Sequence, residues 1–147
     1  MKNIILIPVL LLLLLNQLHA IEPVYSEILA KDSVSWDGKE FAYPTGVPEI
    51  TIKKITIDPG GKELVLSEHC HTFPLAAYVL SGSVHVEEPS GRYHIFRAGN
   101  AFIEVMNSWH KGKFTEPTEL IAFYAGSVDT PLSIKKDSDA GHTSGCK

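Results

Sequence analysis

The sequence predicts an all-β domain built from short antiparallel strands, and three observations support this fold class. Short runs rich in β-branched and apolar residues recur along the chain. Turn segments such as Asp58-Pro59-Gly60-Gly61 and Glu88-Pro89-Ser90-Gly91 separate these runs. No stretch after residue 21 combines a sustained helical period with helix caps. Many short strands punctuated by turns are typical of an antiparallel sandwich or barrel.

The first twenty residues have the layout of a secretory signal peptide. Lys2 supplies the positive charge, residues 4–15 are apolar without interruption, and a short polar stretch then ends at Ala20, where we expect cleavage. A membrane span needs about 20 apolar residues, so this run is short for one, and an uncleaved anchor is the alternative. We therefore expect a periplasmic or secreted protein without stable membrane insertion after the signal peptide 1–20 is removed.

Residues 21–147 are enough for one domain with its own core. The chain carries 13 basic and 17 acidic residues, a net charge of −4, and its basic residues are scattered. Nucleic acid is therefore not an expected partner. Cys70 and Cys146 would lie in a compartment where disulfides persist. We expect two free thiols, and a bridge between them is the alternative, which spacing alone cannot show.

The elements follow one another in a simple order. We expect an irregular N-terminal arm at residues 21–35 and a barrel domain at 36–134. Strands are predicted at residues 50–57, 63–67, 76–86, 93–96, 101–105, 110–114, 120–124 and 131–134. The longest is interrupted around Gly82, and glycine inside a strand marks a bend, a bulge or a close backbone approach. Residues 135–147 are mostly small and polar, which predicts a disordered tail.

Two histidines separated by one residue provide the first chemical signal. His69 and His71 project from the same face of a strand, so both imidazoles can meet at one point. Cys70 faces the other way and is not expected to be a third ligand. Two neutral imidazoles suit Zn, Fe, Ni, Mn or Cu. A histidine pair on the protein surface is the alternative.

Two longer motifs extend this signal. Glu68-His69-Cys70-His71, followed by residues 77–82 (AYVLSG), resembles the first motif of the cupin superfamily, an HxH on a strand that runs into YVLxG. The segment from Gly99 to His110 is similar to the second cupin motif, in which a glycine opens a strand and a histidine closes it. The resemblance covers residues 36–134. It implies a single-domain jelly-roll barrel that binds one divalent transition metal through His69, His71 and His110, and homodimers are common among its members.

The chain departs from the cupin pattern in its fourth ligand. The first motif usually carries a glutamate where this chain has Leu75, and the second differs at Val105, Asn107 and Phe114. The site then consists of three histidines with open positions, or it recruits Glu104 as a fourth ligand or as a general base on metal-bound water. An unpaired buried carboxylate costs several kcal/mol, so a Glu104 on the outer surface is the competing interpretation.

These observations lead to a functional hypothesis and its alternatives. We expect an exported cupin that binds a divalent metal and acts on a small molecule in its barrel, as a dioxygenase, an isomerase or a hydrolase. The alternative, supported by the missing glutamate at Leu75, is a non-catalytic small-ligand or metal-binding module of the periplasm. An inert barrel is the third possibility. We expect solvent-facing positions for His85 and His94. Aromatic residues are expected to line the barrel or its mouth, namely Tyr78, Phe102, Trp109, Phe123 and Tyr124.

Overall fold

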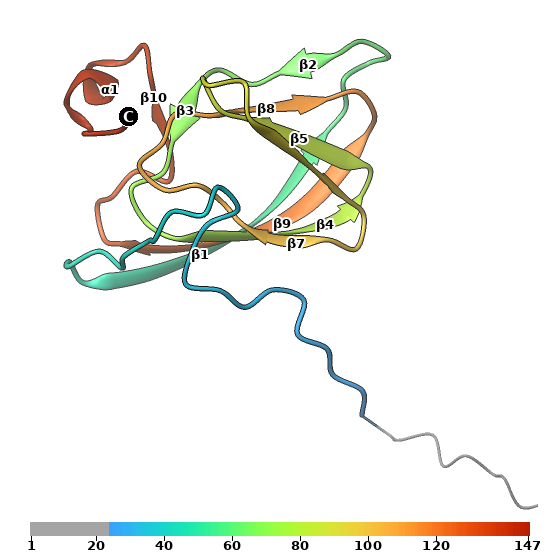
Figure 1. Cartoon of the computed structure of the whole chain (residues 1–147), viewed down its shortest axis with the longest axis horizontal. Helices are drawn as coiled ribbons and strands as arrows, with labels where there is room; N and C mark the ends of the chain where they lie inside the picture. The colour runs from blue at the N-terminus through green and yellow to red at the C-terminus, as the bar shows by residue number, and fades with distance from the viewer. Residues whose placement is uncertain (1–23) are drawn as a thin grey trace, which may run out of the picture.

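A computed structural model describes residues 24–147 and shows two antiparallel sheets that enclose the interior of a barrel (Figure 1). The first sheet has the order β1 (Pro48–Ile57), β9 (Thr118–Ser127), β4 (Leu75–Ser81), β7 (Ala101–Ile103). The second has the order β2 (Leu64–Val65), β8 (Lys111–Phe114), β5 (Ser83–Glu87), β6 (Tyr93–Arg97). A separate pair joins β10 (Ile134–Lys135) to β3 (His69–Cys70). The predicted all-β, single-domain antiparallel jelly-roll barrel is confirmed.

Strand β1 shows how residue alternation builds the barrel wall. All ten of its residues are in register with β9, from Pro48 opposite Ser127 to Ile57 opposite Thr118. Ile55 and Ile57 line the interior, whereas Ile52 is 65% exposed. The side chains of a strand alternate between its two faces, so the odd-numbered positions of β1 face inward.

Gly82 joins the two sheets between β4 and β5. Its φ of 72° lies in the left-handed region that glycine adopts without strain. A Cβ at this position would collide with the carbonyl oxygen of Pro117. The glycine therefore permits both the change of direction and the close approach to the start of β9. This is the bend and close backbone contact that the sequence predicts.

The C-terminal segment differs from the predicted disordered tail. It forms β10 and then helix α1 (Asp139–Thr143), whose N-terminal residue Ser138 accepts a hydrogen bond from the Gly141 amide at 3.1 Å. Cys146 forms a disulfide with Cys70 across 76 residues, which corrects the expectation of two free thiols. Composition predicts disorder because the segment buries little apolar surface, but a covalent bond and backbone hydrogen bonds hold it instead.

The N-terminal part of the chain is described only from residue 24. The predicted signal peptide 1–20 and the first residues of the arm lie outside the described residues. Residues 24–33 are exposed. A hydrogen bond of 3.0 Å from the Trp36 amide to the Ile103 carbonyl joins the following residues to β7. Among the described residues, no helix has the length and hydropathy required to cross a membrane.

Candidate metal centre

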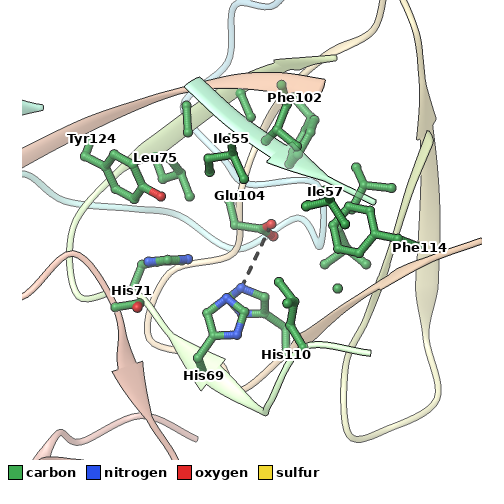
Figure 2. Close-up of a pocket in the computed structure, with 18 of the residues that line it drawn as sticks. Ile55, Ile57, His69, His71, Leu75, Phe102, Glu104, His110, Phe114 and Tyr124 are labelled. Carbon is green, nitrogen blue, oxygen red and sulfur yellow. Dashed lines mark ion pairs between the residues drawn. The ribbon is translucent and has the colours of Figure 1, made fainter. Parts of the chain in front are cut away.

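Three histidines from two separate segments meet at one end of the barrel (Figure 2). His69 lies in β3, His71 follows directly after it, and His110 comes immediately before β8. The backbones of His69 and His110 are joined by two reciprocal hydrogen bonds of 2.9 Å, so the two segments are held side by side. The ligand nitrogens of the three rings lie within 4.8 Å of one another. The structure thus brings together the three histidines that the two motifs predict.

Each imidazole is oriented by a main-chain carbonyl. The Nδ1 atoms contact the carbonyl oxygens of Ser67 (2.9 Å from His69), Leu132 (2.6 Å from His71) and Ser108 (3.0 Å from His110). A carbonyl oxygen can only accept, so each Nδ1 carries the hydrogen and each Nε2 keeps a free lone pair. Hydrogen bonds of this kind fix the tautomer and the orientation of metal-ligating histidines.

Burial favours the neutral form of His69 and His71, in which Nε2 can donate its lone pair to a metal. It lowers the pKa of His71 to about 3, and the nearby His110 ring contributes to the shift. Burial and His110 also lower the pKa of His69. The Nε2 atom of His110 is buried and has no hydrogen-bond partner among the described residues. A buried nitrogen acceptor without a partner is unfavourable, and a metal ion would satisfy it.

Glu104 faces the interior of the barrel. Its side chain lines the cavity, and the residue is only 6% exposed, so the outer-surface alternative is wrong. One carboxylate oxygen accepts hydrogen bonds from the Trp36 indole at 2.8 Å and from the Val105 amide at 2.9 Å. The other oxygen lies 3.9 Å from Nε2 of His110 (Figure 2). No lysine or arginine within residues 24–147 forms an ion pair with Glu104.

These residues fit a divalent transition metal. Three imidazole nitrogens and one carboxylate oxygen form a donor set found for Zn, Fe, Mn, Ni and Cu. The buried Nε2 of His110 lacks a partner, and the buried carboxylate of Glu104 lacks a cation. A bound cation would satisfy both. Sequence analysis missed Trp36, which is 68 residues from Glu104 and has no local signal. The inward direction of Glu104 follows from Phe102, two residues earlier on the same face.

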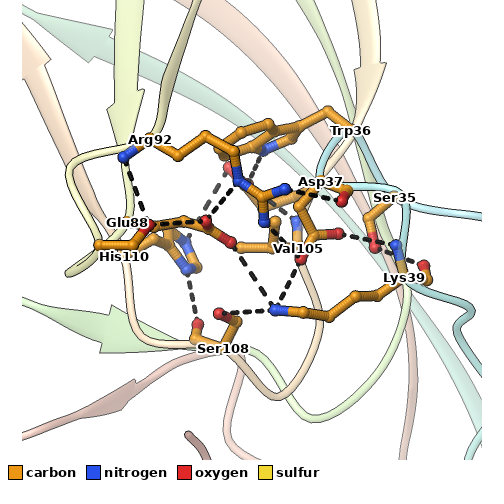
Figure 3. Close-up of polar contacts among 11 residues, drawn as sticks. Ser35, Trp36, Asp37, Lys39, Glu88, Arg92, Val105, Ser108 and His110 are labelled. Atoms are coloured by element: carbon orange, nitrogen blue, oxygen red, sulfur yellow. Dashed lines mark hydrogen bonds and ion pairs between the residues drawn. The ribbon is translucent and has the colours of Figure 1, made fainter.

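A second polar cluster lies close to this site (Figure 3). Asp37 and Glu88 have side chains that are 0% and 5% exposed, and their partners are Lys39 and Arg92. The shortest ion pairs measure 2.8 Å, one from Lys39 to Asp37 and one from Arg92 to Glu88. Burial alone would raise the pKa of Asp37, but hydrogen bonds and the charge of Lys39 lower it. Positive side chains thus balance these two buried carboxylates.

The histidines open into a cavity of about 380 Å³ inside the barrel. Leu75, at the position where the cupin pattern usually has glutamate, contributes an apolar wall. Phe102 and Tyr124 also line the cavity, as expected, but Phe123 is 40% exposed on the outside. Trp109 is buried against the C-terminal segment, where its amide donates to the Lys147 carbonyl at 2.9 Å.

The other histidines and aromatic residues named in the sequence analysis differ in how deeply they are buried. His94 is exposed, as expected, and its ring lies 4.5 Å from that of Phe96 between centroids, in a tilted arrangement. His85 is half-buried rather than solvent-facing, with a buried Nε2, and lies 4.5 Å from the Tyr93 ring. Tyr78 is half-buried and does not line the cavity. Sequence analysis missed two residues that line the cavity, Ser133 in the last predicted strand and Lys135 at the start of the predicted disordered tail.

Comparisons with known proteins give a likeness in fold. No protein-family model matches the chain, and no curated protein matches it. The chain is similar to an RmlC-like cupin from Shewanella frigidimarina (TM-score 0.46, 19% identity, 68% of this chain and 95% of that one). It is similar to KdgF from a Halomonas species (TM-score 0.46, 21% identity, 61% and 82%). It is also similar to the DMSP lyase DddQ from Ruegeria pomeroyi (TM-score 0.49, 13% identity, 61% and 44%), spanning less than half of that protein.

These similarities concern the fold alone, and the activities of those proteins are not assigned to this chain. The chain's own residues place the HxH pair and the closing histidine of the second motif at one end of the barrel. The chain is therefore an antiparallel β-barrel that is similar in fold to cupins, and its three motif histidines converge on a common point.

Proposed function

We propose that this chain is a metal-dependent protein of the cell envelope that acts on a small molecule held in its barrel. The observation that carries the proposal is the convergence of three Nε2 atoms whose rings are all fixed by main-chain carbonyls. The buried Nε2 of His110, which has no partner among the described residues, supports it. The location in the envelope rests on the signal peptide expected at residues 1–20.

In this proposal the protein residues have distinct roles. His69, His71 and His110 hold the metal, and Glu104 is a fourth ligand or an acid/base group. A divalent metal supplies Lewis-acid activation of a bound water or of a substrate oxygen. Trp36 and the Val105 amide hold one oxygen of Glu104, which leaves the other oxygen directed at the histidines. Reactions in keeping with these groups are dioxygenation, isomerisation and hydrolysis.

The second candidate is a non-catalytic module that binds a small ligand or stores metal. Leu75 favours it, because an apolar side chain occupies the wall where a glutamate would complete the shell. The two candidates differ in whether the metal keeps an open position. Water-proton relaxation of the Mn²⁺-loaded chain measures this directly. Fast-exchanging water on the metal supports the enzyme, and its absence supports the module.

Metal content measured by mass spectrometry on the untagged, purified chain tests the proposal. We expect about one transition-metal ion per chain. The triple variant His69→Ala, His71→Ala, His110→Ala should hold none, while His94→Ala should match the wild type because this histidine is exposed and outside the site. Circular dichroism checks that the variants fold. Failure of the wild type to bind any of the five metals after incubation would contradict the proposal.

A further inference from the structure

The cavity has two chemically different parts, and this division defines the ligand that fits it. The inner part is walled by apolar side chains from both sheets, including Ile55, Ile57, Phe102 and Phe114. Figure 2 shows these four side chains grouped on one side of the space, with the histidines on the other. Apolar surface gains free energy by leaving water, so a molecule that fills this part has an apolar body.

Lys135 provides a positive charge at the histidine end of the cavity. It lines the cavity with Ser133 and lies directly opposite His69 in the β10–β3 pair. Residues directly opposite each other in an antiparallel pair project from the same face, so both side chains lie on one side of this small sheet. No carboxylate within residues 24–147 forms an ion pair with Lys135, whereas Lys136 pairs with Glu68 at 3.0 Å.

In the metal-free chain, the charges of the lining residues favour a monoanion over a dianion. Among the described residues that line the cavity, Lys135 is the only lysine or arginine, and Glu104 adds a negative charge to the same space. A dianion such as a phosphate monoester would have one of its two charges balanced by Lys135, and its other charge would be repelled by Glu104. A carboxylate has a single charge that Lys135 balances. Ser67 and Ser133 also line the cavity, and a serine hydroxyl can donate a hydrogen bond to a carboxylate oxygen.

We propose that the cavity binds a small organic carboxylate with an apolar body. The carboxylate lies beside Lys135, and the body lies among the apolar walls. This inference rests on the proposed function, because it assumes that the cavity takes a small molecule. It adds the chemical class of that molecule, and it assigns Lys135 as a specificity-determining residue.

Isothermal titration calorimetry with a matched series of ligands tests the inference. Butanoate, hexanoate and octanoate are compared with butanol, hexanol and octanol on the full chain, both metal-free and metal-loaded. We expect affinity to rise with chain length and each carboxylate to bind more tightly than its alcohol. Lys135→Gln should weaken carboxylate binding by about fivefold in the metal-free chain, the effect of a partly exposed ion pair, and leave alcohol binding unchanged. Lys62→Gln, an exposed lysine in the turn after β1 and outside the cavity, should change neither.

The outcomes separate this inference from the proposed function. Equal affinity for carboxylates and alcohols, a preference that survives Lys135→Gln, or no binding at all would overturn the ligand class. Metal content is measured on the same samples. A chain that holds metal but lacks the carboxylate preference contradicts the ligand class alone. A chain that binds no metal but prefers carboxylates through Lys135 contradicts the metal proposal alone.

Discussion

Glu88 and Glu104 are both buried, at 4% and 6% exposure, but their surroundings differ. Glu88 has a positive partner on each side, with Arg92 at 2.8 Å and Lys39 at 3.8 Å. Glu104 has only neutral donors and the ring of His110. Trp36 contacts both regions, because its indole N–H bonds Glu104 while the Arg92 guanidinium lies 6.0 Å from its ring centroid.

The difference indicates which cluster is structural. A buried carboxylate needs a compensating charge, and the protein supplies one to Glu88 from its own side chains. At Glu104 no lysine or arginine among the described residues does so, and the nearest side-chain nitrogen of the histidine site is Nε2 of His110 at 3.9 Å. The charges of the Glu88 cluster are therefore balanced by its own side chains, whereas the metal ion that we propose would supply a compensating charge at the histidine site.

The largest expected effect concerns the disulfide beside the histidine site. Cys146→Ser removes a link across 76 residues. The unfolded chain then gains conformational entropy, which should lower the free energy of unfolding by about 4 kcal/mol. Denaturant titration measures this loss. Hydrogen exchange should show less protection at residues 69–71 and 107–110 and little change at 88–92. Equal loss of protection in both regions would remove the contrast between them.

Glu88→Gln should have the next largest effect on stability. It leaves Arg92 and Lys39 without one of their partners and Asp37 as the remaining carboxylate of the cluster. We expect the melting temperature to fall by roughly 10 °C, measured by differential scanning calorimetry. Metal content should stay at the wild-type level, because none of the three histidines contacts this cluster. A loss of metal in this variant would show that the two regions are coupled.

Trp36→Phe should have a smaller effect that is confined to the histidine site. It removes the indole N–H that Glu104 accepts at 2.8 Å and keeps most of the ring. The loss of one hydrogen bond to a charged group should cost about 1 to 2 kcal/mol in the metal-free chain. Metal affinity should also fall, because one constraint on the carboxylate is gone. Titration with a fluorescent metal competitor measures that affinity, and an unchanged value would show that Trp36 does not position Glu104.

Glu104→Gln should have the smallest effect on the metal-free protein. The amide oxygen can still accept from Trp36 and Val105, and the amide N–H can donate to His110. Replacing an uncompensated buried charge should therefore change the unfolding free energy by less than about 1 kcal/mol, or raise it. The same change at Glu88 destabilises. If Glu104 is the fourth ligand, metal affinity should fall at least tenfold. Destabilisation as large as in Glu88→Gln would contradict the comparison.

The fold and the three histidines could be predicted because their signals are local. Turn residues between short strands mark the barrel, and the i, i+2 spacing puts His69 and His71 on one face. His110 was predicted through the resemblance to the second cupin motif. Contacts across long sequence distances could not be predicted. Trp36 meets Glu104, Leu132 meets His71, and Cys146 meets Cys70 only after the sheets have formed. No periodicity or spacing encodes such pairs.

The late position of Cys146 in the chain also affects the order in which the parts of the barrel can fold. Every strand of the two four-stranded sheets lies before residue 128, whereas β10 and Cys146 come later in the chain. During synthesis from the N-terminus, the two sheets can therefore pair before the segment that braces His69 and Trp109 exists. The histidine end is then the last part of the molecule to close. We expect this delay to leave a period during folding in which an ion from the surroundings has free access to the three imidazoles.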